Sequence, residues 1–123
     1  GIYAAMLLVE MIAVTGKRLS EIIKEIEAQY GAISMEEHDY HFSNEKKAEI
    51  RKVLLEEKRI PELPFKIDHV SYLDGSKVYF ENGGWVIARF SGTEPLLRIF
   101  AEMPDTADAA KVVKLYEDFL GLK

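Results

Sequence analysis

The first thirty residues carry two apolar patterns that predict a pair of helices. Residues 2–14 are almost continuously apolar, and Gly16 after them suits the left-handed conformation that ends many helices. Ser20 is suited to cap a second helix, which carries a stripe of isoleucines and stops near Gly31. Two helices alone cannot bury this much apolar surface, and the chain opens inside a helix without a methionine. We therefore interpret residues 1–31 as the helical tail of a preceding domain, cut at its start.

A stretch of mixed character follows and leads into a third helix. Residues 32–37 are expected to be a linker, because the alternation of Tyr40 and Phe42 gives the first sign of a strand. Ser43 is suited to cap the third helix, whose apolar positions lie on one face and which two prolines bring to an end.

From residue 65 the pattern changes to short runs that alternate between apolar and polar residues. Asp74-Gly75 is a typical hairpin turn, and an Asn-Gly-Gly turn follows at 82–84. The expected strands are residues 66–73, 77–81, 85–90 and 96–103. Asp105 or Thr106 is suited to cap a last helix, which has a regular apolar stripe and is closed by Gly121. We expect residues 38–123 to form an α+β domain, an antiparallel four-stranded sheet with two helices on one face.

Composition narrows the classes of function. The chain has a net charge of -5, which argues against a nucleic-acid partner because duplex binding depends on a basic surface. The apolar run at 2–14 contains Glu10 and is too short to span a bilayer, so no membrane partner is expected. The absence of cysteine excludes disulfides and thiolate chemistry, and a cytoplasmic location is the natural expectation.

The loop between the last two expected strands carries the most informative chemistry. Ser91 and Thr93 supply hydroxyl groups, and Gly92 lets backbone N–H groups approach a ligand closely. Arg89 can present a bidentate fork to phosphate oxygens. Together these groups favour a tetrahedral dianion.

The position of a second arginine admits two interpretations. In a hairpin centred between Thr93 and Glu94, Arg98 stands opposite Arg89, and two like charges on one face favour an anion between them. In the alternative, Arg98 is a surface residue paired with Glu94 or Glu102. The residue pattern leaves both open.

Residues 89–98 resemble the C-terminal signature of the α-D-phosphohexomutase superfamily, which includes phosphoglucomutase, phosphomannomutase and phosphoglucosamine mutase. The pattern Arg-x-Ser-Gly-Thr-Glu-Pro-x-x-Arg is met throughout, and Glu102 falls at the family's downstream acidic position. Asp74-Gly75 with Lys77, and then Trp85, resemble the family's approach to this loop. Residues 1–31 are similar to the end of the family's third domain.

The resemblance implies a four-domain isomerase whose last domain has a TATA-binding-protein-like fold. Such enzymes interconvert hexose 1-phosphate and 6-phosphate through a bisphosphorylated intermediate. A phosphoserine in the first domain transfers the phosphoryl group, a Mg²⁺ ion is held in the second, and the third contacts the sugar. The fourth domain binds the phosphate that is not reacting, through residues that match Arg89, Ser91, Gly92, Thr93 and Arg98.

Several of the family's motifs have no counterpart in this sequence. It contains no serine in a Ser-His-Asn-Pro context, no Asp-x-Asp-x-Asp cluster for Mg²⁺ and no Gly-Glu-x-Ser-Gly sugar loop. We therefore expect no catalytic residue, metal ligand or cofactor in this chain. For the full-length parent the resemblance implies Mg²⁺ and a hexose 1,6-bisphosphate activator.

The expected partners are a phosphosugar, derived from glucose, mannose or glucosamine, and the N-terminal domains of the same protein. The rival interpretation is a non-enzymatic α+β module that uses the same loop to bind a phosphometabolite or a protein.

The three histidines are candidates for metal or acid–base roles. Two histidines three apart on a strand-like segment share a face poorly, and a lone histidine on a strand more often packs or faces solvent. Surface or interdomain roles are favoured for His38 and His41, near Glu37 and Asp39, and a packing or solvent-facing role for His69, beside Asp68.

Overall fold

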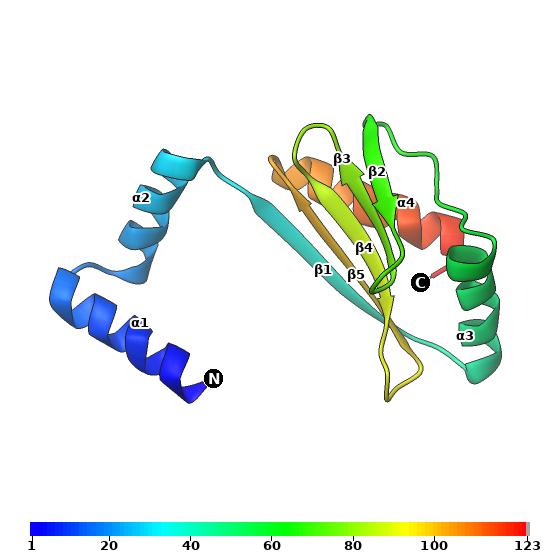
Figure 1. Ribbon diagram of the computed structural model, residues 1–123, viewed down its shortest axis with the longest axis horizontal. Helices are drawn as coiled ribbons and strands as arrows, with labels where there is room; N and C mark the ends of the chain where they lie inside the picture. Colours follow the sequence, from blue (N-terminus) through cyan, green and yellow to red (C-terminus); the bar gives the residue numbers. More distant parts are fainter. Residues whose placement is uncertain (123) are drawn as a thin grey trace. The chain divides into compact units, whose positions relative to one another are not determined.

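The computed structural model in Figure 1 describes residues 1–122, which divide into two compact units. The first unit, Gly1–Ala32, holds helices α1 (Ile2–Thr15) and α2 (Leu19–Tyr30), and the second begins at Ile33. Gly16 ends α1 in the left-handed conformation at φ 65°. Of the helices within the described residues, none is both long and apolar enough to cross a membrane.

The second helix begins two residues before the position expected from the sequence, at Leu19 instead of Glu21. The side chain of Glu21 accepts a hydrogen bond from the Arg18 N–H at 2.7 Å, so this carboxylate satisfies a free donor at the helix start. Arg18 is therefore the N-cap residue, and Ser20 lies inside α2.

The second unit contains one antiparallel sheet of five strands in the order β1-β5-β4-β3-β2. Its strands are β1 (Ser34–His41), β2 (Ile67–Ser71), β3 (Ser76–Phe80), β4 (Trp85–Phe90) and β5 (Leu96–Met103). Strands β2 to β5 form the meander that the turn residues predicted. The α+β class is confirmed.

The expected count of four strands is wrong, because β1 adds a fifth at the edge. It pairs with β5 along its whole length, from Ser34 opposite Met103 to His41 opposite Leu96. Residues 34–37, which the sequence analysis assigned to a linker, therefore belong to the sheet. In this segment the half-buried residues, Ser34 and Glu36, are polar and the one apolar residue, Met35, is exposed, so the sequence lacks the apolar alternation that reveals a strand with one buried face.

Two helical segments cover one face of the sheet. Helix α3 (Asn44–Arg51) begins at Ser43, whose hydroxyl accepts the Lys46 N–H, and continues into a short π-helix, η1 (Lys52–Glu56). Helix α4 (Thr106–Leu120) begins at Asp105 and crosses behind the strands in Figure 1, with α3 near its carboxyl end.

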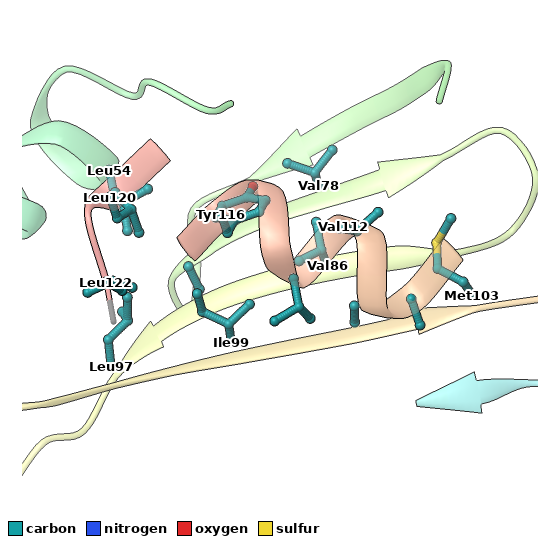
Figure 2. Packing of buried hydrophobic residues seen from close by; sticks show 14 of the residues in the cluster. Leu54, Val78, Val86, Leu97, Ile99, Met103, Val112, Tyr116, Leu120 and Leu122 are labelled. Carbon is teal, nitrogen blue, oxygen red and sulfur yellow. The ribbon is translucent and has the colours of Figure 1, made fainter. Parts of the chain in front are cut away.

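The core lies between these helices and the sheet, and it fixes which way each strand residue faces. Figure 2 shows Val78, Val86 and Ile99 of β3, β4 and β5 gathered around Val112 and Tyr116 of α4. All five side chains are buried, and each of the four aliphatic ones stabilises the unit by about 1.5–3 kcal/mol through removal of apolar surface from water. Because strand side chains alternate, the residues between them project from the other face of the sheet.

Part of this uncovered face is aromatic and basic. The side chain of Lys77 lies 4.0 Å from the ring centre of Trp85 and 4.6 Å from that of Tyr79. The arginines of β4 and β5 emerge on the same face at the end where these strands join.

Candidate functional site

The loop between β4 and β5, residues 91–95, projects from the sheet and is closed by its own backbone (Figure 1). The Ser91 N–H donates to the Leu96 carbonyl at 2.9 Å, and the Leu96 N–H donates to the Glu94 carbonyl at 2.8 Å. Arg89 pairs directly opposite Arg98. The symmetric register that the loop sequence predicted is confirmed.

Each of the two arginines has an acidic neighbour from another part of the sheet. Arg89 Nη1 lies 3.4 Å from Asp74 Oδ2, in the turn before β3. Arg98 Nε lies 3.5 Å from Asp39 Oδ1, which stands opposite it on β1. Both pairs are half exposed, so each contributes about 0–1 kcal/mol to stability.

The alternative that paired Arg98 with Glu94 or Glu102 is wrong about the partner. Glu102 instead accepts a hydrogen bond from the Trp85 indole N–H at 3.1 Å. The true partner, Asp39, lies on the edge strand that the sequence analysis only partly recognised. The site therefore forms a charged row across three strands, in the order Asp39, Arg98 and Arg89.

A small pocket of about 210 Å³ opens at the basic end of this row. Its size lies below the range of about 300–1,000 Å³ that is usual for drug-sized ligands, which suits a compact anion. It is lined by Arg89, Phe90, Ser91, Gly92, Arg98 and Phe100. Four of the five predicted site residues thus line one pocket, while Thr93 lies in the adjoining loop.

The loop glycine has open space around it. A methyl group at Gly92 would have no neighbour within 4 Å, and the residue does not adopt a positive φ. Neither the fold nor the backbone conformation therefore requires a glycine here. A ligand that approaches the backbone closely would supply such a requirement.

Lys47 of α3, a residue that no sequence pattern had indicated, supports the loop. Lys47 Nζ donates to the Ser91 carbonyl at 3.3 Å and to the Glu94 carbonyl at 3.1 Å. Ser91 and Glu94 lie 44 and 47 positions after Lys47 in the sequence, so no local pattern could have indicated these contacts.

Comparison with known families matches residues 11–116 to the family described as "Phosphoglucomutase/phosphomannomutase, C-terminal domain". The chain belongs to the phosphoglucomutase/phosphomannomutase family. The resemblance seen in the 89–98 signature is thereby confirmed, and the α+β unit is a domain of the family's C-terminal type.

Relatives in this family carry several substrate names. A phosphoglucomutase/phosphomannomutase of Thermococcus kodakarensis is 37% identical over 88% of this chain and 21% of its own length. A probable phosphoglucosamine mutase of Methanosarcina acetivorans is 39% identical over 93% of this chain and 24% of its own. A phosphopentomutase of T. kodakarensis is 34% identical over 80% and 20%. The chain thus spans about a fifth to a quarter of these mutases.

A second polar cluster in this family member ties β1 to α4, away from the pocket. Glu117 Oε1 accepts a hydrogen bond from the Tyr40 hydroxyl. The same oxygen lies 3.1 Å from His38 Nδ1. The hydrogen bond from Tyr40 is the main cause that holds the pKa of Glu117 below its ordinary value, and the contact with His38 acts in the same direction. Burial, with the bond to Glu117, raises the pKa of Tyr40.

The other two histidines lie apart from His38. His69 stacks on Tyr79 with ring centres 4.3 Å apart and contacts Asp68 at 2.6 Å, while His41 stands opposite Leu96 at the far end of β1. Within residues 1–122 the structure brings together no group of three histidine or acidic side chains able to hold a metal ion.

Proposed function

We propose that this chain is the substrate-phosphate-binding part of a phosphohexomutase that interconverts hexose 1-phosphate and 6-phosphate through a bisphosphate intermediate. The observation that carries the proposal is the pairing of Arg89 with Arg98 across the hairpin, beside a pocket lined by Ser91 and Gly92. Two guanidinium forks and a glycine-containing loop suit the oxygens of a phosphate dianion.

The proposed role is to hold the phosphate that does not react. Binding energy from a remote group can orient the reacting end of a substrate and so lower the barrier there. Phosphoryl transfer depends strongly on positioning and charge neutralisation. A bisphosphate intermediate must also turn around between two half-reactions, and a clamp that releases and regrips either phosphate meets that need.

The rest of the reaction is assigned to the N-terminal domains of the parent protein. No group of three histidine or acidic side chains within residues 1–122 could hold a metal ion, and we assign the Mg²⁺ that the family implies to the N-terminal domains. We propose that the parent uses Mg²⁺ and a hexose 1,6-bisphosphate activator in the cytoplasm, and that the 123-residue chain alone has no mutase turnover.

The choice of sugar is likewise assigned to residues beyond this chain. The lining of the pocket offers cationic and hydroxyl groups that address a phosphate, the group that glucose, mannose and glucosamine phosphates share. We propose that the pocket accepts any of these at its phosphate.

The test is a titration of the 123-residue chain with inorganic phosphate, followed by amide NMR. We expect the Gly92 and Thr93 resonances to move most, with a dissociation constant near 1 mM, which corresponds to about 4 kcal/mol. Sodium chloride at matched ionic strength is the control. Shifts that appear elsewhere while this loop stays unchanged contradict the proposal.

A further inference from the structure

Lys47 reaches the β4–β5 loop from the side of the sheet that the helices cover. It lies on α3, and Ile50 of the same helix belongs to the buried core. Its Nζ donates to the carbonyls of Ser91 and Glu94, at opposite ends of the loop, at 3.3 and 3.1 Å. One ammonium group therefore joins the two sides of the loop and sets their separation.

The contact with Ser91 also sets the direction of a neighbouring N–H group. The C=O of residue 91 and the N–H of Gly92 belong to one planar trans peptide, in which they point in opposite directions. Because Lys47 binds the carbonyl, the Gly92 N–H points away from α3. The pocket that Gly92 lines contains Arg89 and Arg98, which project from the uncovered face of the sheet.

The remaining bonds of the loop leave this N–H available. The Ser91 N–H is occupied by the Leu96 carbonyl. Among the described residues, no hydrogen bond is formed by the Gly92 or Thr93 N–H. A backbone donor that is aimed and unoccupied costs no reorganisation when an anion arrives.

The contact with Lys47 keeps the Glu94 carbonyl oxygen, which would repel an anion, pointed away from the pocket. This oxygen accepts from both Lys47 Nζ and the Leu96 N–H. Pro95, which follows it, has no N–H of its own to contribute. The second bond of Lys47 therefore turns a negative dipole toward the helix side and away from the arginines.

We infer that Lys47 is a positioning residue for the phosphate site: it orients the Ser91–Gly92 peptide so that the Gly92 N–H faces the anion. This inference rests on the proposed function of the loop and adds to it a residue outside the 89–98 signature. Lys47 acts through the loop backbone.

The experiment compares phosphate binding by three variants of the 123-residue chain, again by amide NMR. Lys47→Met removes the ammonium group and both bonds, and Lys47→Arg keeps the charge and the donors. Lys46→Met is the matched control, because Lys46 lies on the same helix and contacts Glu49 at 3.2 Å instead of the loop. It removes the same charge without touching the loop carbonyls.

We expect Lys47→Met to weaken phosphate binding about tenfold, which corresponds to about 1.4 kcal/mol. Lys46→Met should change it less than about twofold, and Lys47→Arg should restore most of the affinity. In the anion-free protein only Lys47→Met should move the carbonyl ¹³C resonances of Ser91 and Glu94, which report loss of the two bonds directly. Lys47→Gln, with one amide donor, replaces the methionine variant if that variant does not fold.

Two results overturn the inference and leave the proposed function standing: unaltered phosphate affinity in Lys47→Met, or an equal loss in Lys46→Met, which reduces the effect to net charge. A wild-type chain whose loop resonances do not respond to phosphate overturns the proposed function, and the inference with it.

Discussion

Replacement of Arg98 by glutamine separates anion binding from stability. Glutamine keeps a polar side chain of similar reach but removes the charge. In the anion-free protein two effects oppose each other, because the change removes repulsion from Arg89 and also the contact with Asp39. Like-charge cross-strand pairs and half-exposed ion pairs each amount to at most about 1 kcal/mol. The free energy of unfolding without phosphate should therefore change by less than about 1 kcal/mol.

Phosphate binding should change much more. A hydrogen bond to a charged group contributes about 1.5–3 kcal/mol, so a loss of 2 kcal/mol weakens binding about 30-fold. With a dissociation constant of 1 mM, about 20 mM phosphate stabilises the wild-type chain by about 1.8 kcal/mol. With about 30 mM in the variant, the same phosphate stabilises it by about 0.3 kcal/mol.

Urea denaturation with and without phosphate measures both quantities, with sodium chloride at equal ionic strength as the control. A lower free energy of unfolding of the anion-free Arg98→Gln chain, with the stabilisation by phosphate at its wild-type value, would contradict this expectation. That result would make Arg98 a structural partner of Asp39 and nothing more.

Three further predictions test other parts of the structure. Gly92→Ala should raise the free energy of unfolding by about 0.4–1 kcal/mol, because the site has open space and an ordinary φ, and it should weaken phosphate binding; unchanged affinity in the NMR titration contradicts the close approach of the anion. Gly75→Ala should destabilise the chain by about 1–3 kcal/mol in urea melts, since Gly75 has φ +133° and its Cβ would lie 2.6 Å from the Ala88 carbonyl oxygen; near-wild-type stability would show that this turn can rearrange. The pKa of Glu117 lies below its ordinary value of 4.5, so the ionised carboxylate stabilises the fold above that pH, and this stability is lost as the pH falls through the lowered pKa. Tyr40→Phe should therefore lower the free energy of unfolding by about 1 kcal/mol at neutral pH and by less below about pH 4. If urea melts show a loss that does not depend on pH, Tyr40 and Glu117 are not coupled in this way.

The sequence predicted the parts of the fold that follow from local rules. Turn residues such as Asp74-Gly75 located the meander, and the length of the 91–95 loop placed Arg89 opposite Arg98. Strand β1 was only partly foreseen because its half-buried positions Ser34 and Glu36 are polar, so the start of this edge strand shows no apolar alternation.

Contacts between distant segments could not be foreseen. Asp39 reaches Arg98 only because β1 pairs with β5, and Lys47 reaches the loop only because α3 packs against the sheet. Neither partnership has a spacing that a sequence pattern could reveal, since tertiary packing alone brings these residues together.

For the anion binding proposed above, the two acidic neighbours of the arginines make capture an exchange of partners. Asp74 and Asp39 are tethered to the fold beside Arg89 and Arg98, so each is present at an effective concentration fixed by the chain and independent of the surroundings. An incoming anion competes with these tethered carboxylates, which lowers its apparent affinity by a constant factor. The same carboxylates return to the guanidinium groups as the anion leaves, so departure does not expose two bare, mutually repelling cations. Binding of the proposed anion would therefore replace two ion pairs within the chain, and its release would restore them.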